Sequence, residues 1–187
     1  LGFKYSIREC IVAPKGKKLI IADFSAIELV IIAERSNDQK LAYEHLQGDL
    51  HTIVTREIMG LFWPIAKEIN DKNKKSGVFK LLRDFSKTLS YGIAYGVTGK
   101  SLSSQAEEKL ASVGLKLTEK EGNEAVEAWK RLFPDAGKYL DATARKAVTL
   151  GYTSSLWGRK RWYDLDYLAT NKWAKLAAMR EGSNQEV

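Results

Sequence analysis

Four side chains that can bind a nucleotide recur every four residues in one short stretch of the chain. They are Arg83, Lys87, Tyr91 and Tyr95, in RDFSKTLSYGIAYG (83–96). A step of four residues turns an α-helix by about 400°, so the four side chains form a slightly spiralling stripe on one flank. Two cations near a helix N-terminus suit a polyphosphate, and an aromatic ring further along could stack on a sugar or base.

The same stripe is also compatible with an ordinary amphipathic helix, whose cations extend over apolar surface and whose tyrosines join the core. That alternative predicts aliphatic side chains on the stripe itself. The apolar residues instead mostly take other faces of the helix; they are Leu81, Leu82, Phe85, Leu89 and Ile93. These residues alone leave phosphate binding and a purely structural helix both open.

Two carboxylates follow a short apolar run earlier in the chain. Asp23 lies near the end of KKLIIADF (17–24), which predicts a buried strand, and Glu28 lies in a predicted helix over 25–36. A carboxylate at the end of a buried strand can hold a divalent cation, whereas the alternative makes Asp23 the N-cap of the helix. His51 is a weak signal by itself, because a lone histidine is more often structural than a ligand.

Composition favours a globular protein with a basic face. The 187 residues are 44% hydrophobic and 28% charged, with a net charge of +7. Eight cations and three anions fall between residues 67 and 100, so most of that charge is local. It is compatible with a polyanionic partner and with a merely solvated surface. No apolar run approaches the roughly 20 residues of a membrane span, which excludes that class.

The remaining pattern predicts helices, one hairpin and little sheet. Thr118 and Glu121 form a capping-box pattern, Asp38 and Asp49 are predicted N-caps, and residues 64–80 are predicted to be an exposed connection or a short helix. The expected helices cover 37–48, 49–60, 117–134, 135–152 and a segment from about 171, with a hairpin at 152–163. Either further chain completes the sheet, or the protein is mostly helical.

Together these segments resemble the motifs of family A DNA polymerases, the family of bacterial DNA polymerase I and its phage and organelle relatives. ADFSAIELVIIA (22–33) resembles motif A, D-[YF]-S-x-I-E-x-R, and residues 83–96 match motif B, R-x-x-x-K-x-x-x-[FY]-G-x-x-Y-G. GDLHT (48–52), WGRKRW (157–162) and REGSN (180–184) resemble further segments of the family in the same order. The resemblance spans nearly the whole chain, and motifs A and B at this spacing are highly specific.

The resemblance implies an α/β, mostly helical fold that forms part of the palm and the fingers of a right-hand polymerase. Residues 1–60 would hold part of the palm with motif A and the start of the fingers. Residues 61–150 would be the fingers, with motif B on a helix over 81–96. Residues 151–187 would be a hairpin and a return towards the palm.

The implied activity is template-directed DNA synthesis, in which two Mg²⁺ ions assist transfer of a nucleotide from a dNTP to a primer 3′-hydroxyl. Asp23 would be the catalytic ligand of both ions, and the backbone carbonyl of Phe24 would join the nucleotide-bound one. Lys87 would be the second catalytic residue, as a proton donor to pyrophosphate. The second carboxylate ligand, on motif C, would lie beyond Val187, as would the thumb.

The resemblance also assigns the substrate contacts. Arg83, Lys87 and His51 would clamp the triphosphate, Tyr91 would pack under the sugar and base, and Glu28 would exclude a ribose 2′-hydroxyl. The expected template and primer contacts are Tyr95, Gly96, Arg180 and Asn184.

Further expectations concern the partners, the activity of residues 1–187 alone, the location and two departures from the family pattern. The partners would be primer–template DNA, a dNTP and the rest of the polymerase chain, without a membrane, and residues 1–187 alone would not polymerise DNA. The location would be intracellular, with bacterial cytoplasm or nucleoid, a phage-infected cell and an organelle undistinguished. Tyr91 stands where many members have Phe, a change associated with accepting chain-terminating analogues, and Val30 stands where an arginine is usual.

Two alternatives stay open. A single-subunit RNA polymerase shares the Asp, the Arg/Lys pair and the Tyr-Gly, although Glu28 argues against it because a ribonucleotide needs room there. A non-catalytic nucleic-acid-binding module could keep the same basic face.

Overall fold

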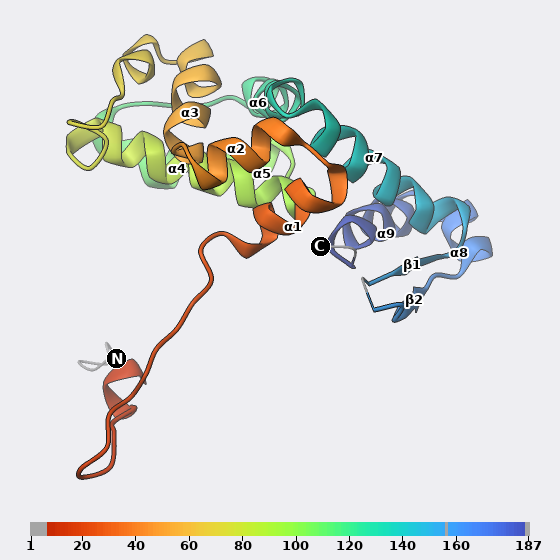
Figure 1. The fold of residues 1–187 in the computed structure, drawn as a ribbon. Coiled ribbons are helices and arrows are strands. Elements are labelled where there is room, and N and C mark those ends of the chain that lie inside the picture. Colours follow the sequence, from red (N-terminus) through yellow and green to blue (C-terminus); the bar gives the residue numbers. More distant parts are fainter. Residues whose placement is uncertain (1–6, 156, 186–187) are drawn as a thin grey trace, which may run out of the picture.

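The computed structural model describes residues 7–155 and 157–185, with backbone only for 7–8 and 183–185. Its elements are mostly helical, as expected, and Figure 1 shows their arrangement. The helices and strands are α1 (Ile27–Ser36), α2 (Gln39–Leu46), α3 (Leu50–Glu57), α4 (Gly77–Ala94), α5 (Gly99–Leu110), α6 (Glu119–Leu132), α7 (Pro134–Thr149), β1 (Tyr152–Ser154), β2 (Lys160–Trp162), α8 (Leu165–Thr170) and α9 (Lys172–Gln185).

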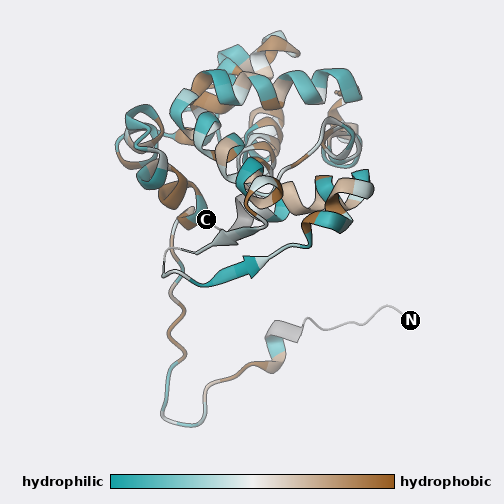
Figure 2. Ribbon diagram, turned by 90° about the vertical axis from the view of Figure 1, so that its right-hand side faces the viewer, coloured by the Kyte–Doolittle hydropathy of each residue, from teal (hydrophilic) through white to brown (hydrophobic). Residues whose placement is uncertain are grey.

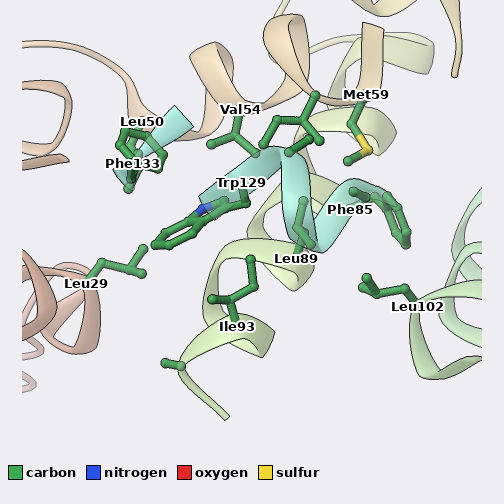
Figure 3. Packing of buried hydrophobic residues seen from close by; sticks show 14 of the residues in the cluster. Leu29, Leu50, Val54, Met59, Phe85, Leu89, Ile93, Leu102, Trp129 and Phe133 are labelled. Carbon is green, nitrogen blue, oxygen red and sulfur yellow. The ribbon is translucent and has the colours of Figure 1, made fainter. Parts of the chain in front are cut away.

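Helix α4 runs through the core of the larger group of helices. Its buried face presents Leu82, Phe85, Leu89 and Ile93. Helices α1, α3, α5 and α6 pack around it. Figure 3 shows Phe85, Leu89 and Ile93 among apolar side chains from these neighbours. Because the apolar residues of α4 point inwards, the flank that carries its cations is left for other contacts.

Two aromatic side chains fill the part of the core beside α6. Trp129 and Phe133 are fully buried and meet edge to face, with ring centroids 5.0 Å apart. Such a pair contributes about 0.5–1.5 kcal/mol beyond the burial of its area.

Helix α7 links this group to a smaller layer made of α8, α9 and the hairpin (Figure 1). Strands β1 and β2 pair antiparallel, with Tyr152 opposite Trp162 and Ser154 opposite Lys160, which confirms the predicted hairpin. Strand β2 is hydrophilic in Figure 2 and exposed along its length.

The expected strand over 17–24 is wrong for this structure. After a turn at residues 14–17, residues 17–24 run as an extended segment away from the helices (Figure 1), and Ile20 and Ile21 are 93% and 91% exposed. A strand requires a neighbour for its backbone hydrogen bonds, and among the described residues only β1 and β2 pair. Asp23 is not an N-cap either, because α1 begins after Ala26, which has a left-handed φ of 48°.

Helix α1 buries only some of its apolar residues. Leu29, Ile32 and Ala33 are buried, whereas Ile27 and Val30 are about 40% exposed. Helix α1 packs on α2, α4 and α7, and these neighbours decide which flank is covered. A hydrophobic run on more than one side of a helix does not by itself make that choice.

Local helix signals are confirmed at several ends. Asp38 accepts a hydrogen bond from the Leu41 N–H at 2.9 Å, and Thr118 forms the capping box with Glu121. Residues 64–76 are a short 3₁₀ helix (Pro64–Glu68) followed by turns. Helix α8, with six residues, was not anticipated. None of the described helices is long and apolar enough to cross a membrane. The division at residues 60 and 150 stays a prediction.

Candidate nucleotide-binding site

Three side chains of the stripe on α4 are partly or largely exposed to solvent. The side chains of Arg83 and Lys87 are 22% and 39% exposed, and Tyr95 is 52% exposed. Tyr91 instead packs partly against the core. The structural role considered for the tyrosines therefore applies in part to Tyr91, while Tyr95 remains open to a ligand.

Two of the predicted site residues, which come from other helices, lie against the stripe. Tyr95 Oη lies 3.3 Å from Glu28 Oε1 and donates a hydrogen bond to it, although the two residues are 67 positions apart. The His51 ring lies 5.7 Å from the Tyr91 ring, centroid to centroid. Helices α1, α3 and α4 thus bring Glu28, His51 and the two tyrosines to one site.

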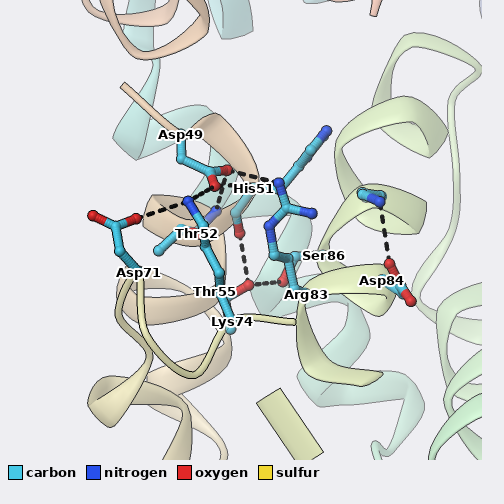
Figure 4. A network of polar contacts seen from close by, with 10 residues as sticks. Asp49, His51, Thr52, Thr55, Asp71, Lys74, Arg83, Asp84 and Ser86 are labelled. Atoms are coloured by element: carbon cyan, nitrogen blue, oxygen red, sulfur yellow. Dashed lines mark hydrogen bonds and ion pairs between the residues drawn. The ribbon is translucent and has the colours of Figure 1, made fainter. Parts of the chain in front are cut away.

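Arg83 is held by the carboxylate of Asp49, which was predicted to be a helix cap and not a partner of Arg83. Its Nη2 donates to Asp49 Oδ1 at 2.9 Å and to Oδ2 at 3.2 Å (Figure 4). Lys74 Nζ donates to Asp49 Oδ2 at 2.8 Å and to Asp71 Oδ1 at 2.7 Å. In the sequence, only the position of Asp49 two residues before His51 hinted at this contact. Its partners Lys74 and Arg83 lie 25 and 34 residues further along the chain.

The charges in this cluster shift two pKa values. Burial raises the pKa of Asp49, but hydrogen bonds from Lys74 and Arg83 outweigh it and hold that pKa well below its usual range. Burial, then the positive charges of Arg83 and Lys87, lower the pKa of His51 to about 4. His51 is therefore neutral at pH 7, so it could offer a phosphate an N–H donor but no positive charge.

Both tyrosines of the stripe stay protonated at neutral pH. Burial, followed by the nearby Glu28 carboxylate, raises the pKa of Tyr91 and of Tyr95. Lys87 Nζ makes an ion pair of 3.1 Å with Asp84 one helical turn away. Because that pair is largely exposed it contributes little, and Lys87 can leave it for a ligand.

The shift at His51 predicts a pH dependence of folding. In the unfolded chain its pKa is near 6.5, so the unfolded state binds more protons than the folded state between pH 6.5 and 4. We expect stability to be present above pH 6.5 and lost as the pH falls through this window, by up to about 3 kcal/mol. Histidine NMR titration of the chain, which has two histidines, should give about 4 for His51.

Replacement of the other histidine, His45, by glutamine serves as the control. His45→Gln should keep the acid-dependent loss of stability above pH 4, whereas His51→Gln should remove most of it. A measured His51 pKa near 6.5 would contradict the burial of its imidazole ring.

Asp23 and Phe24 lie on the extended segment just before α1, and both are exposed. No cluster of three His, Cys, Asp or Glu side chains that could hold a metal occurs within the described part of the chain. Mg²⁺, however, commonly takes one or two carboxylates plus oxygens of a bound phosphate. The Asp23 carboxylate and the Phe24 carbonyl have the hard oxygen donors that such a site requires.

Gly96 and Arg180 lie against one another at the C-terminal end of α4. Gly96 has a φ of +64°, and a Cβ at this position would lie 2.6 Å from Arg180 Cγ. A cleft of about 260 Å³ opens beside them; its lining residues are Gly92, Tyr95, Gly96, Val97, Thr98, Ser101 and Arg180. Asn184 is in α9, but its side chain lies outside the described residues.

These contacts define a candidate site for a ligand with phosphates and an aromatic or sugar ring. The chain belongs to DNA polymerase family A, because the model of that family matches residues 2–187. The resemblance seen in the motifs is thereby confirmed.

Individual relatives agree with this assignment. DNA polymerase I of Mycobacterium tuberculosis is 33% identical over 184 residues, which cover 97% of this chain and 18% of that protein. The thermostable DNA polymerase I of Thermus thermophilus is 28% identical, covering 97% and 19%. This chain therefore spans less than a fifth of the length of these relatives.

A solved structure shares the fold. It is the POL domain of Pol1 from M. smegmatis in complex with DNA primer-template and dNTP, with a TM-score of 0.62 and 28% identity. The match covers 87% of this chain and 25% of that one. The mostly helical polymerase fold expected from the motifs is confirmed.

Proposed function

We propose that this chain forms the nucleotide-binding part of a template-directed DNA polymerase, which transfers a nucleotide from a dNTP to a primer 3′-hydroxyl. The observation that carries the proposal is the stripe on α4. It orders two cations and two aromatics along one flank, with Glu28 and His51 brought against it from α1 and α3. The matched polymerase structure, a complex with primer-template and dNTP, supports the same ligands.

The triphosphate would bind at the N-terminal half of the stripe. Arg83 and Lys87 supply positive charge, and neutral His51 supplies a hydrogen-bond donor beside them. In the reaction, Lys87 would donate a proton to the leaving pyrophosphate, which lowers the cost of its departure. Its flexible, weakly paired ammonium group suits that role.

The sugar, base and template would lie at the C-terminal half. Tyr91, which packs partly against the core, would lie under the sugar and base of the nucleotide. Tyr95 would stack near the templating base, and Gly96 would let the template backbone approach closely. Arg180, which lies against Gly96, and Asn184 would contact the primer–template minor groove, where correct base pairs share acceptors.

Asp23 and the carbonyl of Phe24 would hold Mg²⁺, with a second carboxylate supplied by the motif C segment of the polymerase. The bound ions would activate the primer oxygen and stabilise charge on the leaving group. Residues 1–187 alone would not polymerise DNA, since the family pattern places that second carboxylate outside them. The division into palm, fingers and returning hairpin is proposed on the same resemblance.

Substitution of Glu28 tests whether the site selects deoxynucleotides. In the polymerase that carries this chain, Glu28→Ala should raise ribonucleotide incorporation relative to dNTP by about 10- to 200-fold, because space opens where a 2′-hydroxyl would lie. Competitive single-nucleotide primer extension measures this ratio. Glu34→Ala, an exposed change further along α1, is the matched control.

Glu28→Ala also removes the hydrogen bond from Tyr95. Tyr95→Phe removes that bond while keeping the carboxylate, so it should leave the ratio nearly unchanged. Wild-type incorporation of ribonucleotides as readily as dNTPs would instead favour the RNA polymerase alternative. A complete polypeptide that binds DNA without extending a primer would favour the non-catalytic module.

A further inference from the structure

Asp49 connects the start of the α4 stripe to a loop that the proposed function does not use. Its carboxylate accepts from Arg83 on α4, from Lys74 in the turns before α4, and from the Thr52 N–H of its own helix. Lys74 in turn binds Asp71. Figure 4 shows these side chains converging on Asp49.

We propose that Asp49 is a positioning residue for Arg83, and that Lys74 steadies Asp49 by tying it to the 69–76 connection. This inference rests on the proposed function, in which Arg83 binds the triphosphate. Asp49 would act through the guanidinium and would not itself touch the nucleotide.

The nitrogen atoms of Arg83 are divided in a way that supports this role. Nη2 is used by both oxygens of Asp49, and Nε is buried without a hydrogen-bond partner among the described residues. Nη1 makes no hydrogen bond to a described residue. It is also not one of the buried polar atoms that lack a partner. The Asp49 carboxylate therefore accepts from one guanidinium nitrogen, Nη2, and leaves Nη1 able to donate to a phosphate. The planar guanidinium group, which has several N–H donors, allows this division.

The charges of the cluster show why Asp49 would hold Arg83 without cancelling its attraction for an anion. The partly buried groups are two cations, Arg83 and Lys74, and one anion, Asp49; their side chains are 19–23% exposed. Asp71 is 89% exposed and screened by solvent. A net positive charge thus remains beside Arg83. A chain of partly buried ion pairs also restricts geometry more than the exposed Lys87–Asp84 pair does.

Asp49→Asn is the sharpest test, because asparagine keeps the shape of the side chain and its capacity to cap α3. In the intact polymerase that carries this chain, we expect KM for dNTP to rise about tenfold with kcat within about twofold. A contact that stabilises the bound triphosphate equally in the ground state and the transition state affects KM and leaves kcat unchanged. Lys74→Met should raise KM about threefold. The matched control, exposed Lys72→Met, should change neither constant.

The Arg83→Ala background separates positioning from a general effect on folding. If Asp49 acts through Arg83, Asp49→Asn should add almost nothing to KM once Arg83 is absent. An undiminished effect of Asp49→Asn in that background would overturn the inference. So would a KM that is unchanged or lowered by Asp49→Asn, since a lowered value would mean that the carboxylate competes with the nucleotide.

Failure of the proposed function would look different. If Arg83→Ala itself leaves KM for dNTP unchanged, Arg83 does not bind the triphosphate and the proposed site is wrong. If Arg83→Ala raises KM but Asp49→Asn and Lys74→Met do not, only the positioning inference is wrong. Lys74→Met keeps the test decisive should Asp49→Asn fold poorly, because Lys74 lies outside the helices.

Discussion

Lys87→Ala is expected to lower kcat for primer extension by about 10²- to 10⁴-fold in the polymerase that carries this chain. General acid catalysis by one positioned side chain commonly accounts for a factor of that size. In the proposed mechanism Lys87 donates a proton to the leaving pyrophosphate, so its removal acts on the chemical step. Rapid-quench measurement of a single nucleotide addition reads that step without product release.

Two further variants make the role of Lys87 specific. Lys80→Ala removes an exposed lysine from the same helix and should leave kcat unchanged, which controls for loss of positive charge on α4. Lys87→Arg keeps the charge but has a guanidinium that does not release its proton in proteins. If arginine restored full activity, Lys87 would act by charge alone, and the proton-donor role would be wrong.

The stripe could be predicted from sequence because its information is local. Arg83, Lys87 and Tyr95 lie on one flank by helical period alone, and apolar residues elsewhere on α4 fix which flank faces the core. The caps at Asp38 and Thr118 were likewise predictable, because a cap satisfies N–H groups two or three residues away. Motif spacing then supplied Glu28 and His51, which no local rule could connect to α4.

Contacts between residues far apart in the sequence were harder to predict from the sequence. Asp49 meets Lys74 and Arg83 only because the turns over 69–76 return Lys74 to the start of α3. The low pKa of His51 depends first on burial, which a sequence pattern does not report for a single histidine. The expected strand over 17–24 failed for the same reason: an apolar run specifies a strand only when another strand pairs with it.

Helices α5 and α6 cross at two glycines, Gly99 and Gly122, which no sequence pattern identified as a pair. A Cβ on Gly122 would lie 2.5 Å from the Gly99 carbonyl oxygen and 2.8 Å from its Cα. The Gly99 N–H donates to Asn123 Oδ1 at 3.0 Å at the same crossing. Because the opposing atoms are backbone, no side chain can rotate away to make room.

Gly122→Ala is therefore expected to destabilise the chain by about 3 kcal/mol, despite the better helix propensity of alanine. Propensity would favour alanine by about 1 kcal/mol in an exposed helix, whereas overpacking a tight contact typically costs about 1–3 kcal/mol and more where backbone must move. Because Gly122 lies so close to the Gly99 backbone, we expect a loss of stability at the upper end of that range. Urea unfolding followed by circular dichroism measures the change.

The control is Lys120→Ala, an exposed change on the same helix that should alter stability by less than about 0.5 kcal/mol. Equal or greater stability of Gly122→Ala would show that the two helices do not cross as closely as described. The crossing also bears on the site, because α5 starts three residues after Gly96 and lines the cleft beside Arg180 through Ser101. A Cβ that pushes α5 away from α6 should thus disturb the end of the stripe proposed to face the template, and leave the phosphate end at Arg83 less affected.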